Sequence, residues 1–237
     1  MSVPAQPTRQ ALRNTTLLLA ACALSAFAGC SRPAAPTAKA PEASGPSTPK
    51  PTAAPAGLYK IDRAHTSLTF KVDHMGMSRF TARFTKVDGT LQFDPVHPDR
   101  SVLDVAIDPA SVEADYADDK FSFDKILRSA EMLDVVKFPK MSFRSTRVEL
   151  TGADTARVTG DLTFRGVTKP VTLDTRFNGG YAPNNMDPAG ARIGFSAHGV
   201  LKRSEFGFGY GVPPKGSTMG VGDDVEIIVE TELTHKP

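Results

Sequence analysis

A hydrophobic period of two runs through residues 157–177 and constrains the fold more than any other feature of this chain. Apolar residues occupy mainly the even positions of residues 158–164 and the odd positions of residues 171–177, with polar residues between them. Successive side chains of a strand point to opposite faces of a sheet, so this alternation predicts two strands, each with one apolar face. Gly166 lies between them and predicts the turn of a β-hairpin.

The same alternation recurs along most of the chain after residue 57. Two slips in its parity, near Thr85-Lys86 and before Val148, predict β-bulges. We count about eight substantial strands, with the remaining ones at residues 68–72, 80–93, 103–107, 141–150, 193–199 and 225–233. Antiparallel neighbours joined by tight turns on one curved sheet predict a closed barrel.

One interval, residues 111–139, lacks the alternation. Four apolar residues recur there at the spacing of a single helix face: Phe123, Ile126, Leu127 and Ala130. We expect a short helix with Asp118 or Asp119 as its N-cap. An apolar helix face outside the strands needs a surface to cover, so we predict that this helix covers one end of the barrel.

Residues 1–29 have the anatomy of a secretory signal. Two arginines precede an apolar run that is too short to span a bilayer. Phe27-Ala28-Gly29-Cys30 resembles a lipobox, which predicts cleavage before Cys30 and its lipidation. The alternative is an ordinary signal cleaved nearby, with Cys30 left as a plain thiol.

Residues 30–57 are rich in Ala and Pro and bury too little apolar surface to fold, so we predict a disordered tether. Residues 58–237 then form the barrel domain, which contains no cysteine and therefore no disulfide. Loss of Arg9 and Arg13 with the signal leaves 26 basic residues, equal to the number of acidic ones. No basic stripe stands out, so nucleic acid is not an expected partner.

Catalytic signatures are weak. The domain has no cysteine nucleophile and no G-x-S-x-G turn. His65 and His74 are nine residues apart and would face opposite sides of an unbroken strand, which disfavours a shared metal. The glycines of residues 207–211 lack the Lys-Ser/Thr ending of a phosphate-binding loop. We therefore predict no enzyme activity, no cofactor and no metal.

Three segments resemble the YceI-like family: YKIDRAHTSLTFKVDHMG at 59–76, GDLTFRGVTKPVTL at 160–173 and LKRSEFGFG at 201–209. The resemblance extends from Tyr59 to Leu233. It implies an all-β, antiparallel eight-stranded lipocalin-like barrel of the bacterial envelope that binds polyisoprenoids or other long-chain lipids. With the helix predicted above, one end of that barrel would be covered.

The inward-facing strand residues, the end of the strand at His74 and the apolar face of the helix define a candidate ligand site, and the resemblance supplies its ligand class. Its residues are Phe70, Val72, His74, Met77, Phe84, Phe93, Ile107, Phe123, Leu127, Phe143, Phe164 and Phe195. His74 is expected at the mouth, where a polar group can hold a ligand's head group; the alternative is a hydrogen bond to a loop backbone. Inward small residues are expected to leave room for the ligand: Ala82, Gly89, Gly160, Ala197 and Gly199. Arg203 is expected to pair with a helix carboxylate, such as Asp119 or Asp124.

These features predict an envelope lipoprotein that binds a polyisoprenoid, quinone-like or fatty-acyl ligand for carriage, sequestration or a stress response. Its partners would be that lipid and, through the N-terminal anchor, a membrane, with outer-membrane attachment facing the periplasm as the expectation. Two alternatives stay open: an enzyme acting on an isoprenoid or ester in the same pocket, and a filled barrel serving as a structural module. The sequence also leaves open whether the chain forms a homodimer.

Overall fold

The computed structural model describes residues 48–117 and 120–236. The predicted signal, Cys30, Asp118 and Asp119 lie outside these residues. The strands are β1 (Gly57–His74), β2 (Ser78–Phe84), β3 (Val87–Phe93), β4 (Val102–Ile107), β5 (Val112–Glu113), β6 (Met141–Leu150), β7 (Thr155–Phe164), β8 (Val167–Tyr181), β9 (Ala191–Lys202) and β10 (Val221–His235). The helices are α1 (Phe123–Arg128) and the 3₁₀ turns Pro98–Arg100, Pro109–Ser111 and Arg203–Phe206.

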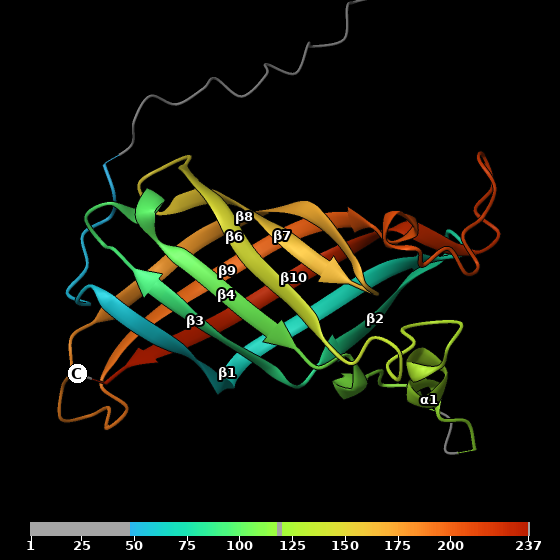
Figure 1. Ribbon diagram of the computed structural model, residues 1–237, viewed down its shortest axis with the longest axis horizontal. Coiled ribbons are helices and arrows are strands. Elements are labelled where there is room, and N and C mark those ends of the chain that lie inside the picture. The colour runs from blue at the N-terminus through green and yellow to red at the C-terminus, as the bar shows by residue number, and fades with distance from the viewer. Residues whose placement is uncertain (1–47, 118–119, 237) are drawn as a thin grey trace, which may run out of the picture. The chain divides into compact units, whose positions relative to one another are not determined.

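Eight antiparallel strands close into a barrel, as Figure 1 shows. Their order around the ring is β1, β3, β4, β6, β7, β8, β9 and β10, and β10 pairs again with β1. The long strand β1 pairs with β3 along its first residues and with β2 along its second half. The short strand β5 adds to β2. The predicted antiparallel eight-stranded barrel is confirmed.

Both predicted parity slips have structural counterparts. Between Ser145 and Arg147, β6 carries one residue more than β7, which is the predicted bulge. At Thr85-Lys86 the chain makes a break between two strands where a bulge was predicted, because β2 ends at Phe84 and β3 begins at Val87. Ser111 bridges that gap: its carbonyl accepts the Thr85 N–H, and its hydroxyl accepts the Lys86 N–H at 3.0 Å.

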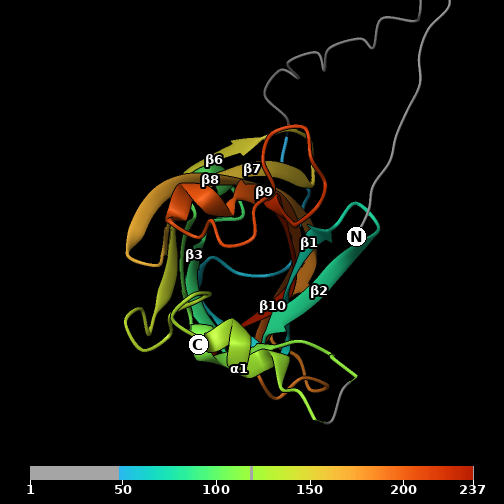
Figure 2. The same ribbon diagram turned by 90° about the vertical axis from the view of Figure 1, so that its right-hand side faces the viewer.

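The helix α1 lies at one end of the barrel, as predicted (Figure 2), and buries Leu127. Its predicted extent is wrong, because the N-cap is Ser122 and Ala130 lies beyond the last helical residue. The chain folds back after Arg128, and the N–H of Leu133 bonds to the carbonyl of Leu127, which ends the helix early. Within the described ranges no helix is long and apolar enough to cross a membrane.

The inward glycines leave less room than predicted. A Cβ added at Gly160 would lie 2.4 Å from the Phe143 ring, because that ring packs across the glycine. At Gly199 the equivalent position lies 2.6 Å from the Leu173 side chain, and at Gly89 it lies 2.4 Å from the Asp104 carbonyl. Close packing between neighbouring strands therefore uses these positions, and they add no space to the interior.

Residues 48–56, here called the strap, pack on the barrel instead of continuing the predicted tether. The Lys50 N–H bonds to the Ala153 carbonyl at 2.6 Å, and the Thr52 hydroxyl donates to the Gly180 carbonyl at 3.2 Å. Ala54 is buried, and the Pro55 carbonyl accepts a hydrogen bond from the buried Tyr59. The strap lies at the end of the barrel away from α1 (Figure 1), so the folded unit begins before the predicted boundary at residue 58.

Candidate functional site

A cavity of about 840 Å³ lies inside the barrel. Its lining includes Pro49 and Thr52 of the strap and Phe123 and Leu127 of α1, so it extends from one end of the barrel to the other. All eight strands of the ring contribute side chains to its wall. Two hydrophobic cores formed by the described residues lie along this space, one towards α1 and one beside the strap.

Eleven of the twelve predicted site residues line the cavity. They are Phe70, Val72, His74, Phe84, Phe93, Ile107, Phe123, Leu127, Phe143, Phe164 and Phe195. Met77 does not: it lies in the β1–β2 turn, and the residue is 77% exposed. Its inclusion rested on its place beside His74 at the strand's end, and the chain turns between these two residues, where Met75 and Gly76 both have positive φ. Ligand contact by the other eleven residues stays a prediction.

Several cavity residues were missed by the sequence analysis. Phe177 lines the wall and its ring packs 5.3 Å from that of Phe195. Phe177 continues the apolar alternation of residues 171–177, so its inward position could have been predicted from the sequence. Tyr116 and Tyr210 also line the cavity from irregular segments, where no periodicity indicates which way a side chain points.

Polar side chains gather where the cavity meets α1 and the loop before β10. His74, Tyr116 and Tyr210 line the cavity there, and within the described ranges none of these three side chains has a hydrogen-bond partner. His74 is therefore not tied to a loop backbone, which was the alternative to a ligand role. An imidazole and two phenols with free hydrogen-bonding capacity can orient the polar end of a mostly apolar ligand.

Arg203 shapes the same end of the cavity. Its guanidinium is buried and donates hydrogen bonds to four backbone carbonyls, those of Phe208, Tyr210, Val221 and Gly222. Burial lowers its pKa, while the charge of a nearby aspartate, Asp223, opposes this shift. The predicted pairing with a helix carboxylate is wrong, since Asp124 instead accepts the Ala114 N–H. Arg203 thus ties the loop after β9 to the start of β10.

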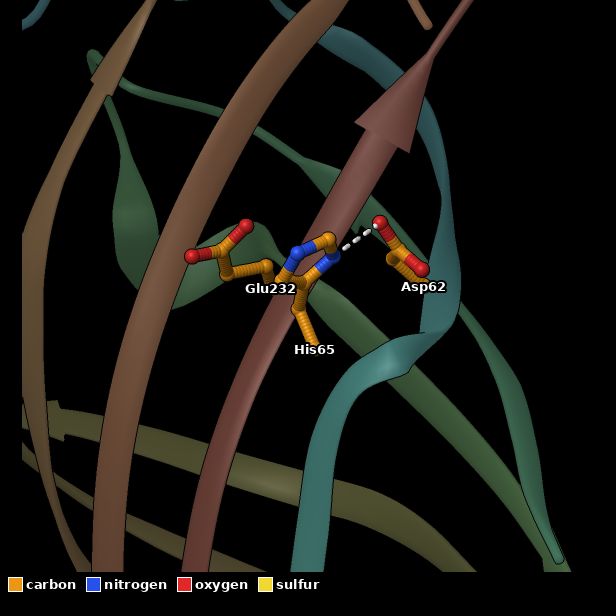
Figure 3. Close-up of side chains that lie close together, drawn as sticks. All are labelled: Asp62, His65 and Glu232. Atoms are coloured by element: carbon orange, nitrogen blue, oxygen red, sulfur yellow. Dashed lines mark hydrogen bonds and ion pairs between the residues drawn. The ribbon is translucent and has the colours of Figure 1, made fainter.

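One group of side chains invites a metal interpretation: Asp62, His65 and Glu232 offer ligand atoms within 4.8 Å of one another (Figure 3). Arg192, however, already donates to Asp62 at 2.8 Å and to Glu232 at 2.6 Å. It also donates to Asp187 at 2.7 Å. The group is therefore an ion cluster that joins β1, β9 and β10 to the loop before β9. Its only sequence signal is the three-residue spacing of Asp62 and His65.

The ion cluster is expected to make the barrel sensitive to acid. Hydrogen bonds from His65 and then Arg192 lower the pKa of Asp62 to about 2, and Arg192 likewise lowers the pKa of Asp187. A carboxyl with a depressed pKa stabilises the fold above its unfolded pKa of about 4, and that stability is lost as pH falls through the folded pKa. The free energy of unfolding should therefore decrease between about pH 4 and pH 2, as urea titrations would measure.

Arg192→Met should lower the free energy of unfolding by about 2 kcal/mol at pH 7, because it removes the cation that Asp62, Asp187 and Glu232 share. The same substitution should weaken the acid dependence. Arg176→Met is the matched control, since its exposed guanidinium pairs with Asp154 and should contribute less than 1 kcal/mol. A rise in the melting temperature of the unsubstituted chain on adding Zn²⁺ would contradict the ion-cluster interpretation and favour a metal site.

The family model for the YceI-like domain matches residues 59–233, nearly the whole barrel. The chain belongs to the YceI family. Protein YceI of Salmonella arizonae is 38% identical over 180 residues, which cover 75% of this chain and 86% of that protein. The strap precedes the residues matched to the YceI-like domain, so the family resemblance gave no indication of it.

Two solved structures are similar to this YceI-like barrel. The Campylobacter jejuni YceI protein is similar with a TM-score of 0.57 and 28% identity, over 70% of this chain and 90% of that one. A polyisoprenoid binding domain from Saccharophagus degradans, implicated in plant cell wall breakdown, has a TM-score of 0.53. At 13% identity over 77% of this chain and 100% of that domain, this second likeness concerns the fold alone.

Proposed function

We propose that the barrel binds a long apolar lipid, a polyisoprenoid or a quinone-like amphiphile with an isoprenoid tail, along its internal cavity. The observation that carries this proposal is the continuous cavity of about 840 Å³, walled by side chains that are mostly apolar. Burying each CH₂ group contributes about 0.8 kcal/mol, so some ten buried carbons could support micromolar binding after the costs of association. The Saccharophagus degradans domain, described as binding polyisoprenoids, agrees with this ligand class.

The length of the cavity favours an isoprenoid over a single acyl chain. Val221 and Leu233 of β10 both line it. Strand residues rise about 3.3 Å each and barrel strands tilt by about 40°, which places these two positions about 30 Å apart along the axis. That is about the thickness of a bilayer's hydrocarbon core, which takes two opposed acyl chains to fill. A fatty-acyl ligand is therefore the shorter alternative, and it would leave part of the cavity empty.

The proposal includes an envelope location. The lipobox-like sequence before Cys30 and the secretory features of residues 1–29 support a lipid-anchored protein facing the periplasm. Carriage, sequestration and a role in envelope stress all suit a barrel that holds such a lipid, and none of them needs a catalytic step. The filled-barrel alternative fits less well, because the side chains leave so large a volume unoccupied.

Native mass spectrometry tests the binding proposal. The full chain, purified from a bacterial envelope, is expected to carry a one-to-one adduct that releases an isoprenoid species on extraction with organic solvent. Release of a fatty-acyl species would instead support the shorter ligand. A clean protein mass, together with no uptake of added polyprenyl or acyl lipids, would rule out the binding function.

A further inference from the structure

Exposed apolar side chains surround the α1 end of the barrel. Six of them form what we call the rim: Met75, Met77, Tyr116, Phe121, Tyr210 and Met219. They come from the β1–β2 turn, the segment before α1 and the loop between β9 and β10, all of which lie at this end (Figure 2). Exposed apolar groups gathered in this way mark interaction surfaces on soluble domains.

Contacts hold the segments of the rim together in two groups. The Met75 N–H bonds to the Gly220 carbonyl at 2.8 Å, which joins the β1–β2 turn to the loop before β10. On the side of α1, the ring of Tyr116 lies 5.7 Å from that of Phe121 and stacks on Phe123 at 5.2 Å. Because Phe123, Tyr116 and Tyr210 also line the cavity, the rim continues directly into the cavity wall.

The opposite end of the barrel also exposes apolar side chains, among them Leu58, Val96, Tyr181 and Met186, but the strap lies across it. There the strap packs against the barrel, and its residues Pro49, Lys50 and Thr52 form part of the cavity lining. If the strap stays in place, the route for a lipid tail leads past the rim. Each CH₂ group of that tail that crosses water costs about 0.8 kcal/mol, so transfer of a long tail is favourable only where the entrance meets another apolar phase.

We propose that the rim docks on the surface of a lipid bilayer and that the ligand passes between bilayer and cavity there. Tyrosines favour the boundary between head groups and hydrocarbon, and methionines adapt to an irregular apolar surface. This inference rests on the proposed function and adds the partner surface and the route of entry.

The position of the N-terminal chain permits this arrangement. The chain enters the barrel at the strap, at the end away from the rim (Figure 1). Seventeen residues separate Cys30 from residue 48. Fully extended, they reach about 60 Å, which exceeds the cavity length of about 30 Å. A barrel anchored through Cys30 can therefore turn its rim towards the membrane that holds the anchor.

The absence of tryptophan from the whole chain makes a direct test available. In the full chain, Met77→Trp and Met219→Trp each place a single tryptophan on the rim. With vesicles of phosphatidylcholine, both are expected to show a blue shift in emission and quenching by brominated acyl chains. Met186→Trp is the matched control, because Met186 is an exposed methionine in the loop between β8 and β9, at the strap end. It should show neither effect.

The rim should also determine the strength of vesicle binding. Met77→Ser with Met219→Ser is expected to weaken partition into the vesicles by on the order of tenfold per side chain, relative to Met186→Ser. Equal quenching at Met186 and at the rim would overturn the proposal, as would no quenching at either. A blue shift at the rim that grows with protein concentration without vesicles would show that a second copy covers it, which would also overturn the proposal.

Lipid retention is measured separately by mass, so failure of docking is distinguishable from failure of the binding function. Rim variants that carry the adduct and do not contact bilayers would contradict only the docking. Loss of the adduct from the unsubstituted chain would contradict the binding function itself.

Discussion

Ala197→Trp is expected to abolish retention of the full-length lipid while leaving the barrel as stable as before or more so. Ala197 lies on β9 between Val229 and Thr175, and all three side chains line the cavity. A volume of about 840 Å³ spread over about 30 Å leaves a cross-section on the order of 30 Å². An indole placed there blocks the passage of a chain.

Loss of lipid without loss of stability distinguishes a blocked cavity from a damaged fold. Filling an existing cavity typically adds about 1 kcal/mol to the free energy of unfolding, whereas overpacking a filled core lowers it. Native mass spectrometry should therefore show loss of the one-to-one adduct, and urea unfolding of the delipidated chain should show no loss of stability.

Val200→Trp is the matched control for Ala197→Trp. It places the same side chain on the same strand, at an outward position that is already half exposed, so the lipid should be retained. If the Ala197→Trp chain kept the same lipid at the same stoichiometry, the ligand would not lie along the cavity. A large loss of stability would instead mean that the space beside Ala197 is filled in solution.

The barrel could be predicted from the sequence because its strands obey a local rule. Each of the eight strands has one face in the interior, so parity alone indicates which side chains point inward. Phe70, Phe143, Phe164 and Phe195 were placed correctly on that basis. Even the bulge between Ser145 and Arg147 was visible, because an extra residue shifts the parity of everything that follows it.

The rule fails where the chain stops being a strand. Met77 was assigned to the site because it stands beside His74 at the end of the strand, yet the chain turns at Met75 and Gly76 and leaves Met77 exposed. Arg203 was expected to pair with a carboxylate, because the sequence shows which residues carry a charge. Its actual partners are backbone carbonyls, which every residue carries and which only the folded loop brings together.

The strap was missed for a compositional reason. Its Ala, Pro and Thr residues each bury little surface. The preceding segment has the same composition, so the whole stretch was predicted to be a tether. What fixes the strap is a set of exposed acceptors on the barrel, at Ala153 and Gly180, that become available only once β7 and β8 have formed. Long-range backbone pairing of this kind leaves no local pattern.

Deleting residues 48–56 should therefore have the second large effect, by opening the strap end of the cavity. The deletion removes the bonds to the Ala153 and Gly180 carbonyls, and it leaves the Tyr59 hydroxyl without its partner. Loss of that hydrogen bond and of the burial of Ala54 should lower the free energy of unfolding by about 2 kcal/mol. Retained lipid should also dissociate at least about tenfold faster, because water now reaches both ends of the tail.

Transfer of the lipid from the protein to acceptor vesicles measures this dissociation rate. Deletion of an equal length, residues 37–45, is the matched control, because it shortens the same N-terminal region by nine residues and keeps the strap intact. If the two deletions gave equal dissociation rates and equal melting temperatures, the strap would not close the cavity. If only the melting temperature fell, the strap would stabilise the barrel without limiting the movement of the ligand. Faster dissociation in the strap deletion alone would mean that residues outside the matched YceI-like domain complete its binding site.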